Sequence, residues 1–189
     1  AHAFGGPKLA VDTLNKNLDL DIKNYVTVNF NTVGEIIDEV GGIVQDLDDS
    51  EVKVINGYID EVNKVRGTSS DHITSAGTYT LDGTQAVAYS RIRYTAGGDY
   101  KRAERQRTVL FKVFESAKEM NTAAKIKMVS DLISHVNTNY DTNEILSVFK
   151  NLADYTVEDS TAYPQVFYGG KVDGAWVEVP TTLADMATG

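Results

Sequence analysis

Apolar and polar positions alternate between helical and strand-like spacing in the first quarter of the chain. Residues 8–18 carry apolar side chains at helical spacing, and a turn at Gly5-Gly6-Pro7 precedes them. Residues 25–30 are rich in β-branched and aromatic side chains and predict a strand. A second helix follows and is expected to end at Gly41-Gly42, after which residues 43–47 predict another strand. This strand–helix–strand order indicates an α/β fold.

Helical spacing dominates the second half of the chain. Residues 48–75 are first acidic and then polar, so they are expected to form a long surface excursion around a short helix at 52–65. Two strand-like segments, 165–168 and 175–179, flank a glycine-rich stretch and predict a β-hairpin with a long turn. We expect one domain over residues 1–189. Its remaining helices are predicted at residues 85–89, 100–120, 123–137 and 143–153.

Composition removes several classes of chemistry. The 189 residues are 42% apolar and 24% charged, which is ordinary for a globular domain. The chain has no cysteine, which excludes disulfides, thiolate metal sites and cysteine nucleophiles. A formal net charge of -9 disfavours broad binding to nucleic acid. An acidic cluster could bind calcium, although a solvated loop is the simpler interpretation; it consists of Asp46, Asp48, Asp49 and Glu51.

A basic island interrupts this acidic chain. Five of the six arginines lie in the run SRIRYTAGGDYKRAERQR, which begins at Ser90 and holds six basic residues against only Asp99 and Glu104. Such an island suggests recognition of one anion rather than general attraction to polyanions. Arginine suits this role because its guanidinium is a planar fork of donors that fits phosphate oxygens.

Helical projection separates the arginines after residue 100. With Asp99 as the N-cap, Arg102 and Gln106 extend the apolar stripe of this helix toward its N-terminus. Arg105 and Arg107 lie progressively off that face, and for both we expect surface ion pairs. The free N–H groups of a helix N-terminus add to its attraction for an anion.

Two further arginines precede the helix. If the backbone is extended there, Arg91 and Arg93 project to one side while Ile92 points to the other. Together with Arg102 and Gln106 they could clamp a pyrophosphate. The residues alone leave this functional interpretation and a purely structural one equally open.

The same residues carry a resemblance to a known family. The order LDGTQAVAYSRIRY, a glycine-containing connector and DYKRAERQR resembles the LytR–CpsA–Psr family. AHAFGGP is similar to the family's turn before its lipid-pocket helix, and NYVTVNFNTVGEIIDEVGGI is similar to its strand–helix–strand unit. The resemblance covers residues 1 to 119 in order.

The resemblance implies a fold and an activity. The fold is an α/β/α sandwich with a central mixed β-sheet, enclosing an apolar tunnel for a prenyl chain. The activity is magnesium-dependent phosphotransfer of a teichoic acid or capsular polysaccharide from a polyprenyl-pyrophosphate carrier to peptidoglycan. Core packing is the simpler explanation for each candidate tunnel residue; these are Phe4, Leu9, Leu14, Val33, Ile37, Leu110, Val113 and Phe114.

Site residues follow from the family motifs one by one. Arg91 and Arg93 match an arginine-x-arginine pair, and Arg102 and Gln106 match the second motif, so all four are expected to bind pyrophosphate. Arg105 matches the remaining motif arginine and is included in the same set. Arg93 and Arg102 are expected to be catalytic, by stabilising charge on the transferring group.

The chain departs from the family pattern at its start. An acidic strand that holds Mg²⁺ and a Pro-Arg-Asp segment have no counterpart in it. We therefore expect no metal ligand in this chain and a sheet that lacks its N-terminal strands. The missing part is either cleaved, or absent from this sequence, or supplied by a separate chain.

The family also implies a location and partners. Its members act on the extracytoplasmic face of the membrane of Gram-positive bacteria, tethered by an N-terminal helix that is absent here. The alternative to an enzyme is a non-catalytic binder of polyprenyl phosphate or anionic polymer. A transcriptional regulator is a third interpretation, but the sequence has no basic recognition helix for nucleic acid.

Overall fold

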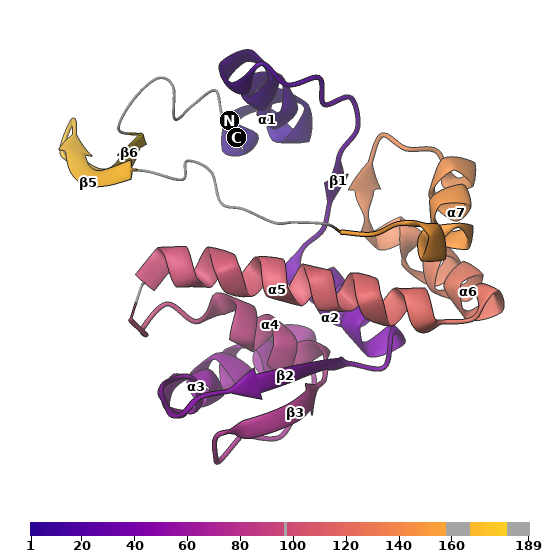
Figure 1. Ribbon diagram of the computed structural model, residues 1–189, viewed down its shortest axis with the longest axis horizontal. Coiled ribbons are helices and arrows are strands. Elements are labelled where there is room, and N and C mark those ends of the chain that lie inside the picture. The colour runs from indigo at the N-terminus through magenta and orange to yellow at the C-terminus, as the bar shows by residue number, and fades with distance from the viewer. Residues whose placement is uncertain (97, 158–166, 181–189) are drawn as a thin grey trace. The chain divides into compact units, whose positions relative to one another are not determined.

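The structure is a computed structural model that describes residues 1–96, 98–157 and 167–180. The chain divides into two compact units: Val26–Val157, and Ala1–Tyr25 with Glu158–Gly189. The elements in chain order, drawn in Figure 1, are α1 (His2–Leu18), β1 (Val26–Thr27), α2 (Phe30–Glu39), β2 (Ile43–Leu47), α3 (Asp49–Arg66), β3 (Gly77–Leu81), α4 (Gly83–Arg91), α5 (Gly98–Glu119), α6 (Thr122–Leu132), η1 (Ile133–His135), β4 (Asn137–Thr138), α7 (Thr142–Lys150), η2 (Leu152–Asp154), β5 (Phe167–Val172) and β6 (Ala175–Pro180).

The expected α/β class is confirmed. The described strands pair as three separate two-stranded antiparallel sheets, β1 with β4, β2 with β3, and β5 with β6. A single central mixed sheet is not found among these residues. The strand–helix–strand order of β1, α2 and β2 is also as predicted, although β1 is only two residues long.

The unit that contains α1 holds a kinked helix and a hairpin. The kink falls at Gly5-Gly6, where the predicted turn separates two helical parts. The long hairpin turn that we expected is wrong, because Val172 pairs with Ala175 and leaves only Asp173-Gly174 as the loop. Both loop residues have positive φ, 49° and 81°, as a two-residue hairpin turn of type I′ requires. Residues 165 and 166 of the predicted first strand lie outside the described residues.

In the larger unit, α4 is the most enclosed helix. It packs against α2, α3 and α5, and seven of its nine residues are buried. The antiparallel pair β2–β3 closes the same core, with Ile43 opposite Leu81 and both fully buried. This packing fixes the end of α4 relative to the start of α5.

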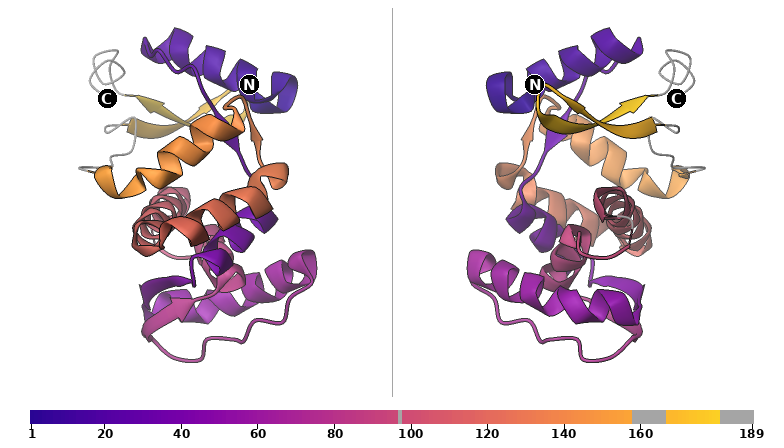
Figure 2. Two further views of the ribbon diagram at one scale, coloured as in Figure 1. Left: turned by 90° about the vertical axis from the view of Figure 1, so that its right-hand side faces the viewer. Right: turned by 90° about the vertical axis from the view of Figure 1, so that its left-hand side faces the viewer.

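The helix predicted at residues 52–65 is confirmed and is longer than expected, but the surface excursion predicted around it over residues 48–75 is wrong in its first part. Residues 49–66 form the 18-residue helix α3, whose Ile55, Ile59 and Val62 are buried in the core. Asp48 caps this helix, and hydrogen bonds from the Ser50 hydroxyl and then from the Glu51 backbone N–H lower the pKa of its carboxyl. The excursion itself is shorter and runs back beside α3 from residue 67 to 76 (Figure 2).

Two glycines let α2 and α4 approach closely. A Cβ atom on Gly83 would lie 2.1 Å from the carbonyl oxygen of Gly34, so only glycine fits. A hydrogen-bond network surrounds this contact: the Arg66 guanidinium donates to Thr84 Oγ1 (2.9 Å) and to Asp38 Oδ2 (2.8 Å). Asp38 Oδ1 in turn accepts from the Gly83 backbone N–H at 2.6 Å. The network therefore joins α2, α3 and α4.

Candidate functional site

The end of α4 positions the first two arginines of the basic island. Arg91 is the last residue of α4, so the extended backbone that we expected there is wrong. Ile92 then leaves the helix with φ -57° and ψ 123° and is completely buried. The expected alternation of side chains is nevertheless confirmed, because Arg91 and Arg93 line one cavity while Ile92 packs into the core.

The start of α5 supplies the other side chains. The helix begins at Gly98 rather than after an Asp99 cap, and Asp99 lies in its first turn. Arg102 and Gln106 face the same cavity as Arg91 and Arg93, as the helical projection predicted. The cavity has a volume of about 680 Å³. Its remaining lining comes from Phe30, Val54, Gly57, Tyr58, Glu61 and Tyr94. We call it the arginine cavity.

Arg91 is held from several sides. Its Nη2 donates to Glu61 Oε2 on α3 at 2.9 Å. Its guanidinium carbon lies 5.5 Å from the centre of the Phe30 ring and 5.6 Å from the centre of the Tyr58 ring. Contacts of this kind attract a cation to the face of the ring. The Arg91 guanidinium is thus fixed before any ligand arrives.

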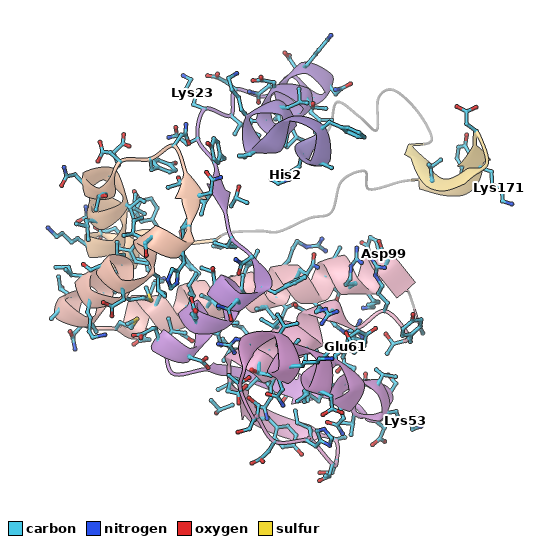
Figure 3. The ribbon with its side chains drawn as sticks, turned by 180° about the vertical axis from the view of Figure 1, so that it is seen from behind. His2, Lys23, Lys53, Glu61, Asp99 and Lys171 are labelled. Atoms are coloured by element: carbon cyan, nitrogen blue, oxygen red, sulfur yellow. The ribbon has the colours of Figure 1, made fainter. Side chains whose placement is uncertain are left out.

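One carboxylate joins the other two arginines. Asp99 Oδ1 lies 3.0 Å from Arg93 Nε, and Asp99 Oδ2 accepts from Arg102 Nη2 at 3.0 Å. Figure 3 shows Asp99 at the start of α5 and Glu61 on α3. Arg102 Nε is buried and has no hydrogen-bond partner in the described part of the chain. Hydrogen bonding of Arg102 is therefore incomplete.

Arg105 lies elsewhere. It is buried, and its Nε donates to Glu51 Oε1 at 2.9 Å. It lines a different cavity, of about 290 Å³, together with Glu51 and Thr95. The surface ion pair expected for Arg105 is wrong, because its ion pair with Glu51 is buried. Arg107 forms no ion pair with a described residue. Binding of pyrophosphate by Arg105 stays a prediction.

Tyr89 lies beside this buried pair. Its ring centre is 5.8 Å from the Arg105 guanidinium carbon, and its hydroxyl accepts from Gln45 Nε2 at 3.1 Å. Burial, followed by the negative charge of Glu51, raises the pKa of Tyr89 to about 12. The phenol therefore stays neutral at physiological pH.

The described residues do not form a metal centre by themselves. No group of three histidine, aspartate or glutamate side chains among them could hold a metal ion. Glu61, which lines the arginine cavity, and Asp99, which pairs with its arginines, are both engaged in ion pairs. Of the acidic cluster, Glu51 is buried against Arg105 and Asp48 caps α3, so two of its members have structural roles.

The structure contains an apolar cavity of about 240 Å³, but none of the candidate tunnel residues lines it. Its walls come from β1, α2, α6 and α7 and include Ile36, Leu132 and Phe149. Of the candidate tunnel residues, Ile37 is buried in the core, whereas Phe4 and Leu110 are exposed. No helix in the described part of the chain is long and apolar enough to cross a membrane.

Comparison with known proteins finds a matching family and several similar proteins. A model of the LytR_cpsA_psr family matches residues 1–186. The polyisoprenyl-teichoic acid–peptidoglycan teichoic acid transferase TagU of Enterococcus faecalis is 33% identical over 158 residues, which are 82% of this chain and 46% of that protein. Biofilm regulatory protein A of Streptococcus mutans is 34% identical over 146 residues, 76% of this chain and 33% of that protein. The chain thus spans less than half the length of these relatives.

A solved structure has the same fold. TagT, a Bacillus subtilis protein, bound to LIIa-WTA aligns with a TM-score of 0.72 at 22% identity. The alignment covers 98% of this chain and 66% of that one. At this identity the likeness establishes the fold alone.

Proposed function

The chain belongs to the LytR_cpsA_psr family, and from this premise we propose that it is part of a transferase. The complete protein would move an anionic glycopolymer from a polyprenyl-pyrophosphate carrier to peptidoglycan. The name of the Enterococcus faecalis relative supports this, since it specifies a polyisoprenyl-linked teichoic acid and a peptidoglycan acceptor. Teichoic acid is therefore favoured over capsular polysaccharide as the polymer.

The observation that carries the proposal is the arginine cavity. Three guanidinium groups and the Gln106 amide reach it from two helix ends that α4 packing holds together. Guanidinium groups bind phosphate oxygens through paired hydrogen bonds, and several of them can neutralise a pyrophosphate. Arg102 Nε is buried and has no hydrogen-bond partner among the described residues, which also favours a ligand. A bound phosphate would give the Arg102 guanidinium the hydrogen bonds that it lacks.

The reaction is a phosphoryl transfer. A hydroxyl of peptidoglycan forms a new P–O bond to the phosphorus that carries the polymer. The bond from this phosphorus to the bridging oxygen breaks, the lipid phosphate leaves, and the acceptor proton is released to water. The product is a phosphodiester.

Each arginine has a part in this step. Arg91, fixed by Glu61 and two aromatic rings, would bind the pyrophosphate in the ground state. Arg93 and Arg102 would exchange Asp99 for phosphate oxygens and stabilise the charge that builds up during transfer.

Magnesium belongs to the proposal for the complete protein only. The ion would neutralise phosphate charge when bound. The described residues do not fit the ion by themselves. The complete protein would act on the extracytoplasmic face of the cell membrane.

The decisive experiment supplies the complete protein with a polyprenyl-pyrophosphate-linked teichoic acid and peptidoglycan. We expect a phosphodiester-linked product, and we expect Arg93→Ala and Arg102→Ala to abolish it while the variants stay folded. Lys101→Ala is the matched control, because Lys101 belongs to the same basic run but does not line the arginine cavity. Full activity of both arginine variants would refute the site. Binding without turnover by the unaltered protein would instead favour a non-catalytic polymer-binding protein.

A further inference from the structure

Arg105 uses each of its three nitrogens on a different partner. Nε donates to Glu51 Oε1 on α3 (2.9 Å), Nη1 to the carbonyl oxygen of Ile92 (3.2 Å), and Nη2 to Thr95 Oγ1 (2.9 Å). Its side chain and that of Glu51 are 8% and 10% exposed. The bonds to Glu51 and Ile92 are buried, and the bond to Thr95 is partly buried. Two of the three partners lie in the connection between α4 and α5, on either side of Arg93.

From these contacts we propose that Arg105 and Glu51 are positioning residues for the arginine cavity. The buried pair fixes residues 92–95 and thereby holds Arg93 in reach of a bound pyrophosphate. The inference rests on the function proposed above, since it takes the arginine cavity to be the pyrophosphate site.

The connection needs such an anchor because Arg93 has little else to hold it. More than half of the Arg93 side chain is exposed, and its one ion pair in the described structure is with exposed Asp99. Ile92 packs into the core before it, and the Thr95 carbonyl accepts from the Gly98 backbone N–H at 3.1 Å after it. The Arg105 hydrogen bonds to Ile92 and Thr95 therefore hold the chain on both sides of Arg93.

Glu51 extends this anchor to the opposite wall of the cavity. Its second oxygen accepts from the Asp48 backbone N–H at 3.2 Å and closes the capping box of α3. The same helix carries Tyr58 and Glu61, which hold Arg91. One buried ion pair thus links the helix that holds Arg91 to the connection that carries Arg93, and sets the spacing of the two guanidinium groups.

Thr95 gives a mild way to test this. Thr95→Val keeps the shape of the side chain but removes the acceptor of Arg105 Nη2, and Thr95→Ser keeps the acceptor. Thr108→Val is the matched control: Thr108 lines the same 290 Å³ cavity, and its hydroxyl makes no hydrogen bond within the described residues. None of these residues lines the arginine cavity.

The experiment measures the affinity of the complete protein for inorganic pyrophosphate by titration calorimetry, and amide hydrogen exchange in residues 92–96. We expect Thr95→Val to weaken pyrophosphate binding about fivefold and to speed this exchange, because one hydrogen bond of the anchor is lost. Thr95→Ser should restore both, and Thr108→Val should change neither. Urea unfolding of each variant separates these effects from a general loss of stability.

Two results would overturn the inference, and they are distinguishable. If the unaltered protein binds pyrophosphate and Thr95→Val binds it equally well, the positioning role is wrong while the proposed function stands. If the unaltered protein does not bind pyrophosphate at all, the proposed site fails and the positioning role fails with it.

Discussion

Asp99 Oδ2 lies 3.0 Å from Arg102 Nη2, one turn apart on α5. The other oxygen of the same carboxylate pairs with Arg93. In the absence of a ligand, Asp99 therefore occupies two of the three guanidinium groups of the arginine cavity. A phosphate that binds there has to compete with it.

Asp99→Asn should tighten the binding of inorganic pyrophosphate about threefold. Ion pairs as exposed as these contribute ~1 kcal/mol or less, so removal of the competing charge gives a modest gain. Titration calorimetry at low salt measures the change, and Asp71→Asn, which removes an exposed charge of the same sign, is the control. Weaker binding of Asp99→Asn would mean that the carboxylate organises the arginines rather than competing for them.

The buried pair of Glu51 and Arg105 should show strong coupling in a double-mutant cycle. Arg105→Met alone leaves a buried carboxylate without its partner and should cost about 3–5 kcal/mol in the free energy of unfolding. Combination with Glu51→Leu should recover much of this loss. Urea denaturation gives all four values. Lys101 and Glu104, an exposed pair at 2.8 Å, provide the comparison, with an expected coupling below ~1 kcal/mol. Additive effects at the buried pair would contradict the structure.

Tyr89 should make stability depend on pH in the alkaline range. Its pKa is about 12 in the folded protein, against about 10 for an unfolded chain. The unfolded state therefore loses its proton first, so the contribution of Tyr89 is complete below pH 10 and is lost as the pH rises to 12. The stability difference between the unaltered protein and Tyr89→Phe should shrink across this interval. The same substitution at exposed Tyr94 is the control, and a constant difference for Tyr89 would refute the prediction.

Two glycine substitutions should act in opposite directions. Gly83→Ala forces a Cβ atom onto the Gly34 carbonyl and should cost about 1–3 kcal/mol or more. Gly57→Ala, in the middle of α3 with no atom within 4 Å of the added carbon, should stabilise the protein by up to ~1 kcal/mol. Urea midpoints of the two variants measure both effects. A harmless Gly83→Ala would show that α2 and α4 can separate.

Local patterns were sufficient for much of the arginine cavity. Helical projection alone put Arg102 and Gln106 on one face of α5, and the structure has both at the cavity. The alternation around Ile92 was also right in outcome, although Arg91 belongs to a helix rather than to an extended segment. A helix end followed by one extended residue directs its flanking side chains to one side, as a strand does.

Ion pairs between residues far apart in the chain could not be predicted from local sequence patterns. Arg105 finds Glu51 at a separation of 54 residues, and no spacing rule connects them. One local signal was available: Glu51 precedes Ile55, Ile59 and Val62 at helical spacing, so α3 carries an acid on its buried stripe. An acid in that position needs a buried cation. The predicted helix began only at residue 52 and was placed within a surface excursion, so Glu51 was not counted on its buried face.

The buried pair also restricts how this sequence can evolve. Replacement of Glu51 or Arg105 alone leaves the other charge uncompensated inside the protein, whereas replacement of both by apolar residues does not. Any path from the charged pair to an apolar pair by single substitutions therefore passes through a destabilised variant. Natural variants of this chain should therefore keep both residues or exchange both, and covariation of positions 51 and 105 would be the record of that barrier.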